Sequence, residues 1–202
     1  MNLPNALTLI RMPLTFAIVA LMYGTWPWAA TLAFWLFIAA AITDWLDGKL
    51  ARERNSVSDL GKFMDALVDK ILVIGIMVAL LDLDYLRLPG AFVMLMVLLM
   101  ITREFMISGL RMMAATRGVV MAAELGGKLK TIIQLIALGC LLGEPMFARD
   151  LARVCPFPLD GVAGLIHWIG IGLFFVSMGF MLSSMWSYFW KYRHVLFDRP
   201  AA

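Results

Sequence analysis

Long apolar runs separated by short polar segments dominate this chain. A helix that crosses a bilayer needs about 20 mainly apolar residues, and six stretches approach or exceed that length. They cover residues 7–23, 28–46, 60–81, 89–110, 127–142 and 162–190, with turn-forming residues between them. The pattern predicts an all-α, polytopic membrane protein with six transmembrane helices, organised as a single domain over residues 1–202.

The composition supports a membrane location. Hydrophobic residues make up 62% of the 202 positions and charged residues 15%, whereas a soluble domain is about half apolar and about a quarter charged. A soluble fold could not bury this excess of apolar surface. The net charge of +3 fits attraction to lipid headgroups, and we expect membrane lipids and no nucleic acid among the partners.

Lysine and arginine are distributed unevenly between alternate connections, which predicts the orientation. The connections on one side, together with the chain ends, hold most of these cations, from Arg11 to Arg199, whereas the other side holds only Arg87, Arg149 and Arg153. The richer side is expected to be cytoplasmic. Both termini and the active site would then face the cytoplasm from the cell inner membrane.

Four aspartates are the most informative polar residues. Asp44 and Asp47 are three positions apart at the end of the second predicted helix, and Asp65 and Asp69 are four apart in the third. These spacings place each pair on one helix face, and the short connection predicts antiparallel neighbours whose carboxylates can face each other.

Such a cluster needs a neutralising partner. Each aspartate inside a membrane helix costs about 2.5–3.5 kcal/mol, and nearby like charges resist ionising together. Divalent cations would offset both costs, and an all-oxygen ligand set favours Mg²⁺ or Mn²⁺. Two carboxylate-bound metals beside a lipid surface suggest phosphoryl chemistry, with a partly free carboxylate as general base. A structural salt-bridge network is the alternative.

The aspartates belong to a longer pattern that resembles a known family. The pattern matches the signature of the CDP-alcohol phosphotransferases at every fixed position: Asp44-x2-Asp47-Gly48-x2-Ala51-Arg52-x8-Gly61-x3-Asp65-x3-Asp69. The resemblance implies a two-metal site made by the four aspartates, with Asp69 as the catalytic base. It also implies a homodimer and a CDP-lipid site that includes Gly48, Ala51, Arg52 and Gly61.

An N-terminal element adds a weaker similarity. Pro4 and Thr8 form a Pro-x3-Thr pattern that resembles a family element contacting the diphosphate of the CDP-lipid. A proline that starts a helix, with a capping residue nearby, would explain the same pair equally well. Both residues are therefore expected CDP-lipid contacts, with the helix-start explanation left open.

A second set of residues bears on the acceptor alcohol. Thr102-Arg103-Glu104 with Arg111, and the run from Gly127 to Thr131, look like the branch of this family whose acceptor is glycerol 3-phosphate. Arginine suits phosphate, and Arg103 would be costly in a membrane helix without a partner. Because adjacent residues on a helix point apart, we expect that partner not to be Glu104. The expected phosphate-binding residues are Arg103, Arg111, Lys128 and Lys130, although these cations could instead only set the orientation.

The resemblance therefore implies transfer of a phosphatidyl group from CDP-diacylglycerol to glycerol 3-phosphate, giving phosphatidylglycerophosphate and CMP. A serine, inositol or cardiolipin type of phosphatidyltransferase is the nearest alternative. Outside the family, intramembrane carboxylates could serve a cation-coupled transporter or a purely structural membrane subunit. The sequence assigns no role to His167, His194, Cys140 or Cys155.

Overall fold

The chain folds into a bundle of long helices. A computed structural model describes the backbone of residues 3–54, 59–116 and 125–197, and the side chains of residues 10–44, 67–68, 70–114 and 129–191. The described backbone forms six α-helices and two short non-α turns: α1 (Leu3–Met22), α2 (Ala29–Arg54), α3 (Asp59–Asp82), α4 (Gly90–Thr116), α5 (Leu125–Pro145), η1 (Met146–Asp150), η2 (Leu151–Arg153) and α6 (Asp160–Phe197). A helix lies at each of the six predicted stretches, which confirms the all-α prediction.

Several helices are longer than the apolar runs that predicted them. The second run ends at residue 46, but α2 continues to Arg54, and α6 extends over 38 residues to Phe197. The added residues of α2 are mostly leucine, alanine, lysine, arginine and glutamate, which all favour helix. The helix therefore continues for as long as the backbone preference allows, beyond the point where the apolar run ends.

The beginning of α2 is held by two neighbouring turns. A Cβ atom on Gly24 would lie 2.9 Å from the Ala29 Cβ, so the tight connection from α1 to α2 requires a glycine there. From the other side, Asp150 at the end of η1 accepts hydrogen bonds from the backbone N–H and the hydroxyl of Thr31, both at 2.8 Å. A buried carboxylate at a helix N-terminus satisfies a free N–H and matches the helix dipole.

The helices pack around one shared core. α5 lies along α6, α1 packs against both α2 and α3, α2 also contacts α5, and α4 contacts α3 and α6. The buried core draws one or more side chains from each α-helix, among them Ile18, Phe37, Ile76, Val97, Leu138 and Phe174. α1 therefore packs against both aspartate-bearing helices. The core joins all six helices.

Large apolar side chains also cover much of the outside. Phe16, Trp35, Leu98, Ile132 and Trp168 are all exposed, an arrangement that lipid tolerates and water does not. Among the described residues, three helical segments are long and apolar enough to cross a membrane: Gly90–Ala114, Leu129–Arg153 and Asp160–Lys191. Two shorter apolar segments, Ile10–Met22 and Ala29–Asp44, accompany them. These features are those of a membrane protein.

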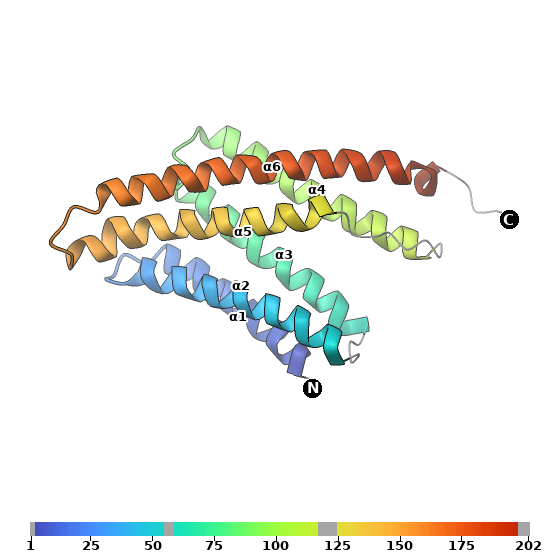
Figure 1. The fold of residues 1–202 in the computed structure, drawn as a ribbon, viewed down its shortest axis with the longest axis horizontal. Coiled ribbons are helices and arrows are strands. Elements are labelled where there is room, and N and C mark those ends of the chain that lie inside the picture. The colour runs from blue at the N-terminus through green and yellow to red at the C-terminus, as the bar shows by residue number, and fades with distance from the viewer. Residues whose placement is uncertain (1–2, 55–58, 117–124, 198–202) are drawn as a thin grey trace.

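The signature residues gather at one end of the bundle. Figure 1 shows the N-terminal end of α1, the last turns of α2 and the first turns of α3 at the lower right. The last turns of α4, the first turns of α5 and the C-terminal end of α6 lie at the same end of the long axis. The fold therefore brings the aspartate-bearing and the cation-bearing segments to one end of the bundle.

Candidate active site

The four aspartates lie on helical backbone, as their spacing requires. Asp44 and Asp47 lie in α2, and Asp65 and Asp69 lie in α3. Only the side chain of Asp44 is among those that the structure describes; the side chains of the other three lie outside them. The helices that would place each pair on one face are present, and the mutual arrangement of the carboxylates stays a prediction.

The expected CDP-lipid contacts fall on the same segments. The backbone of Pro4 and Thr8 lies in α1, and α2 and α3 carry the others: Gly48, Ala51, Arg52 and Gly61. These six positions lie outside the residues whose side chains the structure describes. Their helical context is established, while their contact with a CDP-lipid stays a prediction.

Arg11 is a site residue that the sequence reasoning treated only as a topology signal. Its Nη1 donates a hydrogen bond of 2.6 Å to Asp44 Oδ1, and the Arg11 side chain is 2% exposed, against 35% for Asp44. One turn along α1, the Thr15 hydroxyl donates to the Arg11 carbonyl. A single arginine inside an apolar run is costly unless it has a partner, and that cost was the sequence signal that could have identified it. α1 therefore supplies a buried cation to the first aspartate of the signature.

A hydrogen-bond chain joins the second aspartate helix to α4. Lys70 follows Asp69 directly, and its Nζ donates to Ser108 Oγ at 2.6 Å. Ser108 Oγ in turn donates to the backbone carbonyl of Glu104 at 2.7 Å. Neither Lys70 nor Ser108 was among the predicted site residues. Their contact connects the backbone that carries Asp69 with the segment of α4 that carries the predicted acceptor residues.

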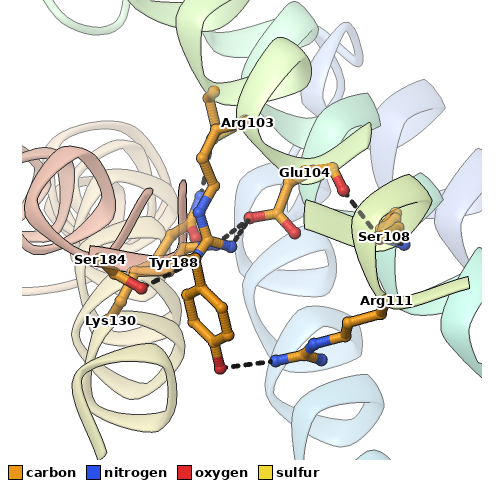
Figure 2. Close-up of polar contacts among 10 residues, drawn as sticks. Arg103, Glu104, Ser108, Arg111, Lys130, Ser184 and Tyr188 are labelled. Atoms are coloured by element: carbon orange, nitrogen blue, oxygen red, sulfur yellow. Dashed lines mark hydrogen bonds and ion pairs between the residues drawn. The ribbon is translucent and has the colours of Figure 1, made fainter. Parts of the chain in front are cut away.

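A cluster of polar side chains lies between α4, α5 and α6. We call it the polar cluster, and its members are Arg103, Glu104, Arg111, Lys130, Ser184 and Tyr188. Figure 2 shows these side chains converging from the three helices, with the Glu104 carboxylate directed toward the Arg103 guanidinium. Arg103, Lys130, Ser184 and Tyr188 are buried. Buried cations of this kind require partners, and the cluster provides them.

Glu104 is the partner of both buried cations in this cluster. Its Oε1 accepts hydrogen bonds from Lys130 Nζ and, at 3.0 Å, from Arg103 Nη1. The prediction that the partner of Arg103 would not be Glu104 is therefore wrong, although the expected contact with a different residue is also present. The backbone directions of adjacent helical residues do diverge, but both side chains are long enough to turn toward each other, and Lys130 draws the carboxylate to the same place. Arg103 Nη2 also donates to Ser184 Oγ at 3.2 Å.

The predicted acceptor residues differ in their surroundings. Arg111 is exposed, but its Nη2 donates to the buried Tyr188 hydroxyl at 3.2 Å. The Lys128 side chain lies outside the described residues. Tyr188 and Ser184 come from the end of α6, which the sequence reasoning left without a role. Polar residues inside a long apolar helix were the signal that pointed to them.

One of the four candidate metal-binding carboxylates, that of Asp44, is among the described side chains. Among them, no group of three His, Cys, Asp or Glu side chains lies close enough to hold a metal ion, but three of the four aspartates are not part of that set. Asp44 retains partial exposure beside Arg11, and a carboxylate has more acceptor sites than one arginine nitrogen occupies. The chemistry of the donor set, four carboxylates on two helices, fits a hard divalent cation.

An apolar groove adjoins the aspartate end of α2. It has a volume of about 430 Å³ and is lined mainly by α2 and α5, including Phe34, Phe37, Ala41 and Gly139. A Cβ atom on Gly139 would lie 3.5 Å from the Phe37 ring. A large side chain at position 139 would therefore project into the groove and narrow it. Ala41, which lines the groove, lies about one helical turn from Asp44.

A separate set of polar contacts lies at the other end of the bundle. Arg87 Nη2 donates to Glu144 Oε1 at 2.7 Å, and Arg149 Nη2 donates to the Tyr85 hydroxyl at 3.0 Å. His167 is buried on α6. These contacts tie the connections of that end together and include none of the predicted site residues.

Comparison with known proteins agrees with the signature. Residues 1–176 match the CDP-alcohol phosphatidyltransferase family. The chain is 36% identical to CDP-diacylglycerol–glycerol-3-phosphate 3-phosphatidyltransferase from Bacillus subtilis (strain 168), over 94% of each chain. It is 34% identical to the protein of the same name from Salmonella choleraesuis (strain SC-B67), over 98% of each chain. On its signature, its helical fold and these matches, the chain belongs to the CDP-alcohol phosphatidyltransferase family.

Proposed function

We propose that this protein transfers the phosphatidyl group of CDP-diacylglycerol to glycerol 3-phosphate, releasing CMP and forming phosphatidylglycerophosphate. The hydrogen bond from Lys70 to Ser108 carries the proposal, because it joins the backbone of the aspartate signature to the helix of the polar cluster. The names of the Bacillus and Salmonella relatives agree with this reaction. Donor activation and acceptor binding would then take place side by side.

The reaction requires one bond to form and one to break. An acceptor hydroxyl oxygen attacks the phosphorus of the phosphatidyl group, and the bond from that phosphorus to the CMP oxygen breaks. The hydroxyl proton passes to the Asp69 carboxylate, and CMP leaves with the bond electrons. Arg103, Arg111, Lys128 and Lys130 hold the acceptor phosphate, since charge-assisted hydrogen bonds to phosphate are among the strongest in proteins.

A pair of divalent cations, Mg²⁺ or Mn²⁺, would be held by Asp44, Asp47, Asp65 and Asp69. Bound there, they would neutralise the diphosphate of the donor and stabilise the developing charge on the displaced oxygen. Arg11 holds Asp44 from the protein side, so it orients one carboxylate of the set. Gly48, Ala51, Arg52 and Gly61, with Pro4 and Thr8, complete the site for the CDP moiety.

The donor's acyl chains need a path along the bundle from this headgroup site. The apolar groove between α2 and α5 supports such a path, because it begins about one turn from Asp44 and is lined by apolar side chains and glycine. One acyl chain of CDP-diacylglycerol would lie against Phe34 and Phe37. The headgroup would then remain at the signature end.

The same proposal includes a topology. Six membrane-spanning helices, both termini in the cytoplasm and an active site facing the cytoplasm of a bacterial-type inner membrane would explain the uneven distribution of lysine and arginine. In support, α1 begins and α6 ends toward the signature end of the bundle in Figure 1. A homodimer, as the family resemblance implies, would cover part of the exposed apolar surface.

Measurement of CMP release tests the reaction directly. The purified protein in detergent is given CDP-diacylglycerol, Mg²⁺ and one acceptor at a time: glycerol 3-phosphate, glycerol, serine, inositol or phosphatidylglycerol. Glycerol 3-phosphate should give the fastest release, and the lipid product should be phosphatidylglycerophosphate. Faster release with serine, inositol or phosphatidylglycerol would overturn the acceptor assignment. No release with any acceptor would favour the transporter or the structural alternative.

A further inference from the structure

Glu104 occupies a position where a phosphate would be expected to bind. Both of the buried cations in the polar cluster donate to its Oε1. The Glu104 side chain is 19% exposed, whereas those of Arg103 and Lys130 are each 7% exposed. The Glu104 carboxylate is therefore the most exposed of these three charged side chains.

The hydrogen-bonding capacity of Arg103 is not exhausted by these contacts. Its Nη1 donates a hydrogen bond to Glu104 and its Nη2 donates one to Ser184. The buried Nε–H has no hydrogen-bond partner among the described residues. A buried donor left without a partner is costly. A phosphate, with more acceptor oxygens than a carboxylate and a shape that fits the guanidinium fork, could use donors that Glu104 leaves unsatisfied.

Charge balance limits what can replace the carboxylate. Glu104 gives the two buried cations a counter-charge in the empty protein. If the carboxylate turns toward water, an incoming anion must take over that compensation. A phosphate-bearing alcohol can do so, whereas inositol and glycerol carry no anion and serine carries only a carboxylate balanced by its own ammonium group.

We propose that Glu104 is an internal counter-ion of the acceptor phosphate site. It pairs with Arg103 and Lys130 in the empty enzyme, and the phosphate of the incoming acceptor displaces it from both cations. This inference rests on the proposed function for the identity of the acceptor. It makes Glu104 a specificity-determining residue, because only an acceptor with its own phosphate can complete the exchange. Neutral alcohols are then rejected by competition from the protein itself.

The exchange predicts how the nearly isosteric variant Glu104→Gln behaves. Without a competing carboxylate, inorganic phosphate and glycerol 3-phosphate should bind more tightly, by about tenfold or more if one charge-assisted hydrogen bond no longer has to be displaced. Without any anion, the variant should unfold at a lower temperature than the wild type. Added phosphate should raise the unfolding temperature of the variant more than that of the wild type.

A matched control removes a buried carboxylate from the opposite end. Glu144 pairs with Arg87, so Glu144→Gln should also lower the unfolding temperature, but added phosphate should raise it no more than in the wild type. Glu104→Asp keeps the charge and shortens the reach to the two cations. It should lie between wild type and Glu104→Gln in phosphate affinity, which preserves a test if Glu104→Gln does not fold.

The experiment is thermal unfolding of the full-length protein in detergent, with and without inorganic phosphate, together with phosphate inhibition of CMP release. Tighter phosphate binding in both Glu104 variants supports the exchange. Weaker phosphate binding in both variants would show that Glu104 only positions the cations, and would overturn it. Because inorganic phosphate is the probe, the exchange is tested even if the acceptor panel rejects glycerol 3-phosphate.

Discussion

Replacing Arg103 by glutamine should separate the two substrates of the proposed reaction. Arg103 is buried, lies on α4 and uses two of its nitrogens on Glu104 and Ser184. In the proposed complex it donates charge-assisted hydrogen bonds to the acceptor phosphate. Each such bond contributes about 1.5–3 kcal/mol, which corresponds to a factor of about 10 to 150 in binding.

The expected result is a KM for glycerol 3-phosphate that rises by about 10-fold to 150-fold, with little change in the KM for CDP-diacylglycerol. The loss should not be smaller, because Glu104 would remain and would still compete with the acceptor phosphate for Lys130. Arg103→Lys keeps the charge but not the planar fork, so it should give an intermediate KM.

Steady-state CMP release, measured while each substrate is varied in turn, provides both constants. Arg87→Gln is the matched control, since Arg87 also pairs with a glutamate but lies at the other end of the bundle. It should leave both KM values unchanged. If Arg103→Gln raises both KM values alike, or lowers kcat with both KM values unchanged, Arg103 does not bind the acceptor phosphate and the argument fails.

The other predictions address the metal, the donor groove, the α2 cap and the topology. Chelation of divalent cations should abolish turnover. Asp69→Asn should also abolish turnover in the presence of Mg²⁺, while CDP-lipid binding survives at least in part. Near-normal rates in either case would contradict the proposed roles. Gly139→Leu should narrow the groove and raise the KM for CDP-diacylglycerol but not that for glycerol 3-phosphate, and equal effects on both would exclude an acyl chain from it. Asp150→Ala should lower the free energy of unfolding by about 2 kcal/mol, measured by thermal unfolding, with a smaller loss for Asp150→Asn, whose amide oxygen can still accept from Thr31. In intact cells a membrane-impermeant maleimide should label the exposed Cys155 and not the Cys155→Ser variant, whereas labelling of Cys155 only after permeabilisation would reverse the orientation.

Local sequence was sufficient for the helices and for the family. An apolar run predicts the position of a helix, because the signal depends only on residues that are neighbours in the sequence. The aspartate spacing is equally local, since three and four positions correspond to one helix face. These features predicted all six helices and the segments that carry the signature, although they placed the ends of α2 and α6 too early.

The contacts between helices were decided by the tertiary structure. The pairing of Arg11 with Asp44 spans 33 positions, and the hydrogen bond from Arg103 to Ser184 spans 81. No periodicity in either segment specifies such a partner, because the choice depends on how the helices pack around the core. Tyr188 and Lys70 entered the site for the same reason.

Glu104 shows where local reasoning fails most clearly. Its sequence position beside Arg103 predicted that the two side chains would diverge, and by backbone direction alone they would. The position of α5 reverses that outcome, because it brings Lys130 to the same carboxylate oxygen. The sequence by itself determined which charges are present on α4 and α5, and the packing of the helices determined which of them neutralise one another, since a buried charge pairs with whatever partner the fold brings within reach.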